Sequence, residues 1–515
     1  MTTTTEAQTV GRDLNQHKLL TPENISLICA VLTLFAFVAV PWLTEAGKDM
    51  LGISLLTGAV SPTSSSLQGM IQESRWTLLL IPVGALFSFA ALVWERAALR
   101  HKRWTAQLIR VGGLLSFGYF VLAGIQDRQN TSVALMQFSA GGFWLACFAS
   151  FFLIIHSFVQ RPASIALQTR ELGTNGWLRN FTSRINANPR FLRTIAFIFR
   201  FQSFFGLIIV IILAIIFSPV RNGNNLFASQ RNLSNVARDV AETGVLAVGQ
   251  ILVIIIGGID LSVGSVVALT ATGVAFLLMR DFVPAIPAIL IILGLGLLIG
   301  WWNGWTSERF KIPSFITTLA MLSIARGIAH IWSSDIAVPI SYSAGGADPL
   351  FDVIGERING IFPVPAIIMF GVALVMAILL RYTAFGRHLY AIGGNQVAAR
   401  LSGLAVTRIK IFAFMLCGFF AAMAGILHAA QLNQGSPNEA VGYELNAIAA
   451  VVIGGASLNG GKGTIAGAIA GAFILGILDN MLSLNNVNSS TQLVTKGLLV
   501  VAAVALQQVR PRTSD

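Results

Sequence analysis

Runs of about twenty consecutive apolar residues recur along the whole chain, and they constrain its fold more than any other feature of the sequence. A helix of that length can cross the hydrocarbon core of a membrane. We count about fourteen such runs, about four before residue 200 and about ten after it. Because 55% of the 515 residues are hydrophobic and only 11% are charged, the composition excludes a soluble domain. The sequence predicts an all-α, polytopic integral membrane protein.

The predicted spans differ in length and in how often glycine interrupts them. The early spans are Ile25–Leu43, Trp76–Trp94, Leu108–Ile125 and Val133–Val159. The later spans are Phe201–Val220, Gly244–Gly258, Leu261–Met279, Ala285–Trp302, Pro313–Trp332, Pro363–Leu380, Ile409–Ala429, Ala447–Gly455, Thr464–Asn480 and Gln492–Leu506. Ala447–Gly455 is too short to cross alone, so it is either a half-helix or extends into its flanks. Short segments interrupted by glycine are typical of transporters rather than receptors.

The net charge of +12 gives a topology, because lysine and arginine concentrate on the cytoplasmic side of membrane proteins. The basic loops are Glu95–Arg110, Arg161–Arg200 and Arg381–Lys410, and the acidic loops are Ser333–Phe362 and Gln431–Asn446. Fourteen spans place the basic loops inside and the acidic loops outside. We therefore expect both termini in the cytoplasm, and we expect no nucleic-acid partner, because topology and contact with anionic lipid account for the basic charge.

The chain divides near residue 200 into three predicted parts. Residues 1–200 form a membrane extension of about four helices with a basic linker, 201–508 form the main core, and 509–515 form a cytoplasmic tail. The polar first 24 residues indicate that no signal peptide is cleaved. The three cysteines lie in separate apolar runs, so we predict neither a metal site nor a disulfide framework.

The segment VIIIGGIDLSVGS places glycines, an acid and a serine between two apolar runs. Gly257 and Gly258 predict a broken helix or very close packing, and Asp260 with Ser262 follows at once. These four residues are our candidates for a translocation path or helix break. A buried carboxylate there has two interpretations: a polar group on the path, or a cap for a helix starting at Leu261.

A similar segment, AVVIGGASLNGG, occurs near the C-terminus, and it aligns Gly257 and Gly258 with Gly454 and Gly455. Both an internal duplication and a coincidence fit this similarity. Its continuation GGKGT lacks the glycine spacing of a phosphate-binding loop, so we predict no nucleotide site in this chain.

The basic loop Arg381–Lys410 contains a short predicted helix between glycines. Gly393 and Gly394 are expected to break the chain, Asn395 to cap the helix and Gly403 to stop it. Val397 and Leu401 share one face, beside Arg400. A helix this short is marginal in water, so we expect it to need a partner surface.

The chain resembles the integral-membrane permeases of bacterial ATP-binding cassette importers for monosaccharides of the ribose, xylose and galactoside type. The resemblance covers about residues 200–508 and rests on the sequences at Val248–Ala271, Ile312–Ala329, Gly386–Leu404 and Gly442–Leu478. The motifs GGIDLSVG and AIAAVVIGGASLNGGKG are the most specific. The first 200 residues lie outside it.

The resemblance implies a transport subunit of the bacterial inner membrane, with no catalytic residues of its own. A cytoplasmic ATPase that holds ATP and Mg²⁺, an extracytoplasmic sugar-binding protein and a second permease chain would be its partners. The implied contact with the ATPase involves Gly394, Asn395, Val397, Arg400 and Leu401.

Three alternative functions stay open at this stage. A permease for branched-chain amino acids or nucleosides differs only in substrate, whereas an ion-coupled carrier would need more ionisable residues inside its spans than Asp260, Asp479, His156 and His428. A receptor built on the first spans would lack a soluble signalling domain.

Overall fold

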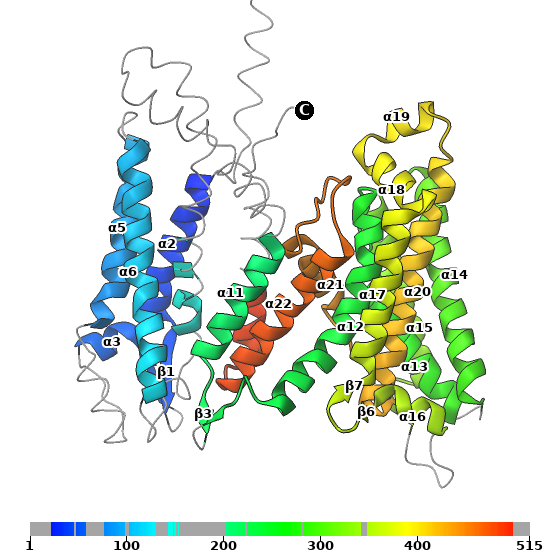
Figure 1. Cartoon of the computed structure of the whole chain (residues 1–515), viewed down its shortest axis with the longest axis horizontal. Helices are drawn as coiled ribbons and strands as arrows, with labels where there is room; N and C mark the ends of the chain where they lie inside the picture. Colours follow the sequence, from blue (N-terminus) through cyan, green and yellow to red (C-terminus); the bar gives the residue numbers. More distant parts are fainter. Residues whose placement is uncertain are drawn as a thin grey trace, which may run out of the picture. The chain divides into compact units, whose positions relative to one another are not determined.

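A computed structural model describes most of the chain as helices joined by short turns (Figure 1). It describes residues 22–45, 48–57, 77–97, 102–129, 143–147, 149–150, 153, 202–221, 224–279, 283–340 and 348–497. The strands in these segments form only two-stranded pairs. The prediction of an all-α membrane protein is therefore confirmed.

Contacts divide the chain into two compact units, which we describe separately. One unit comprises Met1–Arg193, Ile216–Asn224 and Leu482–Asp515, and the other comprises Thr194–Ile215 and Asn225–Met481. The predicted spans Val133–Val159 and Gln492–Leu506 are described only in part, and the linker Arg161–Arg200 lies outside the described residues.

The first unit contains α2 (Pro22–Ala39), α3 (Gly52–Thr57), the 3-10 turn η1 (Thr77–Leu79), α5 (Leu80–Ala97) and α6 (Lys102–Gln129). The antiparallel pair of β1 (Pro41–Glu45) and β2 (Lys48–Leu51) was not predicted. It corrects the span Ile25–Leu43, because Pro41 cannot continue a helix. Trp42 turns back into the core, where its Nε1 donates to the Ala36 carbonyl at 2.7 Å.

Small residues let α5 and α6 pack closely. A Cβ at Gly84 would overlap the Gly112 carbonyl of the facing helix, and Ser116 donates to the Ile81 carbonyl at 3.0 Å. Such contacts are typical of helices that associate inside a membrane.

The second unit is the larger helical bundle. Its helices are α11 (Gln202–Ile216), α12 (Gln230–Ile255), α13 (Val263–Met279), α14 (Ala285–Phe310), α15 (Ser314–Ser333), α16 (Pro349–Gly355), α17 (Val364–Tyr382), α18 (Ala384–Gly394), α19 (Gln396–Leu401), α20 (Val406–Leu432), α21 (Tyr443–Ile453) and α22 (Ile465–Leu484). Its short strands are β5 (Val338–Pro339), β6 (Arg357–Ile358), β7 (Phe362–Pro363) and β8 (Gln434–Gly435), with β5 antiparallel to β8 and β6 to β7. Strand β3 (Val220–Arg221) belongs to the first unit, and β4 (Asn224–Asn225) lies at the boundary. Helices α18 and α19 lie at one end of the bundle, and α16, β6 and β7 lie at the other (Figure 1).

Glycines on α14 determine how the bundle is packed. Gly296, Gly300 and Gly304 recur every four residues, and a Cβ at any of them would meet α20 near Gly418, Phe414 or Ile411. The two helices therefore approach at backbone distance, which small residues permit.

Among the described residues, five helices are long and apolar enough to span a membrane: α14, α15, α17, α20 and α22. The predicted count of about fourteen spans therefore stays a prediction. Helix α12 begins at Gln230 rather than near Gly244, because Ser229 caps it and one side of its polar first half, including Asn232, Ser234 and Glu242, is buried. Helix α21 extends back to Tyr443 but has only 11 residues, about 16 Å, against about 30 Å of hydrocarbon.

Candidate functional site

The four candidate path residues occupy a break between α12 and α13. The Gly258 N–H donates to the Val253 carbonyl and the Gly257 N–H donates to the Ile254 carbonyl, both at 2.9 Å. Gly257 has φ +77°, the left-handed conformation that ends a helix in this pattern. The chain then runs without helical bonds until α13 begins at Val263.

Helix α15 satisfies the free backbone groups of this break. The Ile259 N–H donates to Ser314 Oγ and the Leu261 N–H donates to Thr318 Oγ1, each at 3.1 Å. Two hydroxyls from the first turns of α15 thus replace the bonds that a continuous helix would make. Non-helical backbone inside a membrane needs such partners.

Asp260 is 1% exposed, and its carboxylate is occupied locally. Its Oδ1 accepts the Ser262 N–H at 2.9 Å and the Ser262 hydroxyl at 2.6 Å, and that hydroxyl accepts from Asn303 Nδ2 at 3.0 Å. The Gln250 amide fits the N–H and carbonyl of Asp260, both at 3.2 Å, when its oxygen faces the N–H. Asn303 Oδ1, also buried, has no partner in the described part of the chain.

These bonds decide where α13 starts. The Val266 N–H donates to the Ser262 carbonyl at 2.9 Å, so the helix starts two residues after the predicted Leu261, and that prediction is wrong. Asp260 fixes the approach to the helix by holding Ser262. A role for Asp260 on a translocation path stays a prediction.

The end of α21 repeats the turn that ends α12. The Ala456 N–H donates to the Val451 carbonyl at 3.1 Å, the Gly455 N–H donates to the Val452 carbonyl at 2.9 Å, and Gly455 has φ +91°. Gly455 is therefore the structural equivalent of Gly257. The sequence similarity had instead aligned Gly257 with Gly454, one residue earlier. The segment that follows this second turn reaches the end of α12, since the Gly461 N–H donates to the Ile255 carbonyl at 2.8 Å.

The short helix of the basic loop is α19. Asn395 Oδ1 accepts the N–H groups of Val397 and Ala398 at 3.0 Å, and Gly403 follows the helix with φ +82°. Val397 is 70% exposed and Leu401 is 84% exposed. This short helix therefore exposes two apolar side chains.

Gly393 and Gly394 do not break the chain as predicted. They form the last turn of α18, and only Asn395 separates α18 from α19. A helix can include a glycine pair, at a modest cost, when packing holds it. The linkage between the two short helices is therefore tighter than the sequence indicated.

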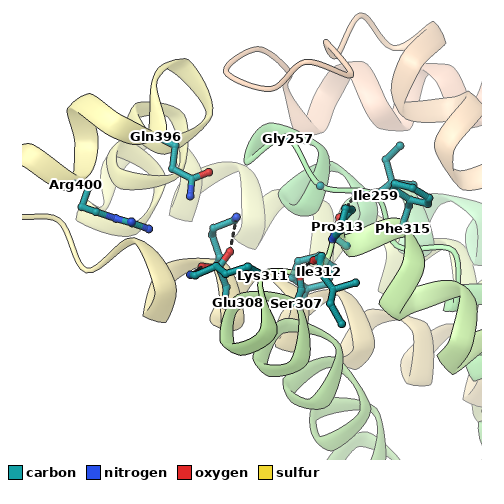
Figure 2. A pocket seen from close by; sticks show the side chains of 14 residues that line it. Gly257, Ile259, Ser307, Glu308, Lys311, Ile312, Pro313, Phe315, Gln396 and Arg400 are labelled. Atoms are coloured by element: carbon teal, nitrogen blue, oxygen red, sulfur yellow. Dashed lines mark hydrogen bonds and ion pairs between the residues drawn. The ribbon is translucent and has the colours of Figure 1, made fainter.

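A cavity of about 450 Å³ brings the helix break and α19 together. Figure 2 shows Gly257 and Ile259 on one side of it and Gln396 and Arg400 on the other, with Glu308 and Lys311 between them. Gly258 also lines this space, whereas Asp260 and Ser262 do not. The structure thus joins part of each predicted residue set in one site.

Sequence reasoning missed the ion cluster on the cavity wall. The Glu308 carboxylate is 6% exposed and contacts Lys410 Nζ at 2.5 Å and Lys311 Nζ at 3.7 Å, while Thr407 donates to it at 3.3 Å. This cluster ties the end of α14 to the start of α20. An acid and a base near the ends of two apolar runs were the available signal.

A second buried network lies at His428 of α20. Its Nδ1 lies 2.8 Å from Glu242 Oε2 and its Nε2 lies 2.8 Å from Glu439 Oε2, while Gln434 donates to Glu439 Oε1 at 2.9 Å. These carboxylates are bound to the imidazole rather than directed at a solute. Within the described segments, no group of three or more His, Cys, Asp or Glu residues could hold a metal ion.

Comparison with known proteins identifies close relatives. The family model described as "Branched-chain amino acid transport system / permease component" matches residues 232–504. The ribose import permease protein of Haemophilus influenzae is 39% identical over 308 residues, 60% of this chain and 93% of that protein. The corresponding Escherichia coli K12 protein is 40% identical over 312 residues, 60% of this chain and 94% of that protein.

The xylose transport system permease protein of H. influenzae is 34% identical over 358 residues, which cover 59% of this chain and 95% of that protein. No solved structure matches the chain.

Proposed function

Because the chain belongs to this family of transport-system permease components, we propose that it is the membrane-spanning subunit of an ATP-binding cassette importer that carries a monosaccharide across the bacterial inner membrane. The observation that supports this most strongly is the match to ribose and xylose permeases over at least nine-tenths of their length. The family description names branched-chain amino acids, so these remain the alternative substrate class with nucleosides.

The work of transport is divided among several chains in this proposal. An ATPase on the cytoplasmic side binds ATP and Mg²⁺, an extracytoplasmic binding protein delivers the sugar, and a second copy of this chain completes the path. This chain binds no cofactor and does no chemistry on the sugar. Its basic loops and both termini face the cytoplasm.

Helix α19 is the proposed contact with the ATPase. Val397 and Leu401 are apolar and largely exposed, and burying each in a partner groove contributes about 1.5–3 kcal/mol. Arg400, on the same helix, would pair with an acid of the partner, although an exposed pair contributes at most about 1 kcal/mol. The cavity beside α19 then lies between the ATPase contact and the break at Gly257–Gly258.

Alternating access needs parts of the path that rearrange without exposing bare backbone to lipid. The two helix ends at Gly257 and Gly455 meet that need, because each is a glycine turn between rigid helices. An ion-coupled mechanism is less well supported, since the network at His428 binds its own carboxylates.

The experiment is uptake in vesicles that contain the permease, its ATPase and its binding protein. Ribose, xylose and galactose are compared with leucine and a nucleoside, with and without ATP. Monosaccharide uptake that requires ATP is expected. Leucine or nucleoside uptake alone would support the alternative substrates, and uptake driven by an ion gradient without ATP would contradict the importer class.

A further inference from the structure

The end of α18 lies against the point where the end of α12 meets the segment between α21 and α22. Gly393, in the last turn of α18, packs so closely against the Ile255 carbonyl that a Cβ on it would overlap the oxygen. That Cβ would also lie 2.5 Å from the Gly461 nitrogen. Ile255 and Gly461 are the two residues whose hydrogen bond joins the end of α12 to the segment between α21 and α22, so Gly393 touches both ends of that bond.

The other residues at this junction are glycines in the left-handed region. Gly460 has φ +85° and Gly461 has φ +73°. A Cβ on Gly460 would lie 3.0 Å from the Gly257 nitrogen and from the carbonyl oxygens of Gly393 and Ile255. Three chain segments thus meet backbone to backbone. The three atoms nearest to a Cβ on Gly393, Gly460 or Gly461 are all backbone atoms, so a change of rotamer would not relieve a displacement here.

A second contact connects α18 with the same turn. Tyr390, one helical turn before Gly393, donates its hydroxyl to the Gly463 carbonyl at 2.7 Å. Gly463 lies just before α22. Helix α18 therefore holds the segment between α21 and α22 at two positions.

Helix α19 has little freedom to move without α18. Asn395 is the single residue between them, and its side chain caps α19 through the N–H groups of Val397 and Ala398. Because only Asn395 separates the two helices, a displacement of α19 also moves Gly393 at the end of α18. From there it reaches the end of α12 and the segment between α21 and α22 together.

The geometry points to Gly393 as a positioning residue, which moves the end of α12 and the segment between α21 and α22 together when α19 is displaced. This inference rests on the proposed function, because it takes the docked ATPase as the source of the displacement. Only glycine fits the position, since any Cβ would push α18 away from the Ile255–Gly461 bond. Gly393 touches no solute and acts through the junction alone.

The test compares two glycine-to-alanine substitutions in the full chain, assembled with its ATPase and binding protein. Gly393→Ala adds a methyl group at the junction, whereas Gly371→Ala adds one on α17, where nothing lies within 4 Å. The readouts are the amount of ATPase that co-purifies, the rate of ATP hydrolysis, and the sugar taken up per ATP hydrolysed.

Gly393→Ala is expected to keep the ATPase bound and to lower sugar per ATP by roughly tenfold or more, while Gly371→Ala matches the wild type. A loss of assembly alone would lower uptake and hydrolysis together and leave their ratio unchanged. Wild-type coupling in Gly393→Ala, or an equal loss in Gly371→Ala, would overturn the inference.

Tyr390→Phe covers the case in which Gly393→Ala does not reach the membrane. It removes only the hydroxyl that holds Gly463, and it should lower sugar per ATP severalfold, whereas Tyr382→Phe at the exposed end of α17 should not. An unchanged ratio in Tyr390→Phe then counts against the junction. Wild-type uptake in the same preparation tests the proposed function separately.

Discussion

Glycines at the helix break are needed for different reasons, either for their backbone conformation or for their small size. The space around each glycine shows which reason applies. Gly257 needs its positive φ, since a Cβ there would meet its nearest atom only at 3.8 Å. Gly258 needs its small size, because a Cβ would lie 3.0 Å from Val253 Cγ1 and 3.3 Å from Phe414 Cζ. The adjacent residues are therefore sensitive to substitution for unrelated reasons.

Gly258→Leu should block transport while the protein still inserts into the membrane. Overpacking costs about 1–3 kcal/mol, so a side chain that one state of the break rejects should lower uptake by roughly tenfold or more. Gly294→Leu is the matched control, because Gly294 of α14 has no atom within 4 Å of its Cβ position. Uptake and membrane content are measured for both. Normal uptake by Gly258→Leu would show that the break does not move during transport.

At the scale of elements, α19 is the clearest case of a helix without enough contacts of its own. It has six residues, and its two large apolar side chains are mostly exposed. Its caps fix its ends, but isolated helices this short are marginal in water. We therefore expect a partner surface to supply the missing stabilisation.

Leu401→Asp should release the ATPase or uncouple transport far more than Arg400→Ala does. The leucine contributes about 1.5–3 kcal/mol when buried, against at most about 1 kcal/mol for an exposed ion pair. The measurement is co-purification of the ATPase together with sugar uptake. If Leu401→Asp keeps both at wild-type levels, α19 is not the docking element.

Asp348 connects two elements at the opposite end of the bundle. Its carboxylate accepts the Ala285 N–H at the start of α14 at 2.9 Å and the Leu350 N–H in α16 at 3.0 Å. These bonds hold the pKa of Asp348 below its usual value of 3.8. Its stabilising effect is therefore complete above 3.8 and is lost as the pH falls through the lower folded value.

Asp348→Ala should lower Tm at pH 7, and the difference from wild type should shrink as the pH falls below 3.8. Thermal unfolding of the purified protein across this range measures it, with Asp352→Ala in the same helix as the comparison. A difference in Tm that does not depend on pH would contradict the role of the ionised carboxylate.

At the scale of the whole molecule, the membrane-protein class, the helix break at Gly257–Gly258 and the short helix α19 could be predicted from the sequence, because each has a local signal. Apolar runs indicate spans, paired glycines indicate a turn, and Asn395 indicates a cap. The long first half of α12 was missed because Arg238 and Glu242 lower its hydropathy while their partners lie far along the chain. The junction at Gly393 was missed for the same reason, since Ile255 and Gly461 are distant in sequence.

Removal of the first 190 residues should leave an importer core that inserts and works. The 308 residues matched to the H. influenzae ribose permease already account for 93% of that protein. A chain starting near Arg190 is tested for insertion, ATPase binding and uptake. If it inserts and binds the ATPase but transports nothing, the N-terminal part is itself required for transport.

The central claim is that this chain carries a monosaccharide and that a partner supplies the ATP hydrolysis. The most direct measurement is uptake of labelled ribose, xylose and galactose by vesicles containing the permease, its ATPase and its binding protein. The account predicts uptake of at least one of these sugars that requires ATP and is lost in Leu401→Asp. Uptake of leucine or a nucleoside alone, or sugar uptake that continues without ATP, would contradict it.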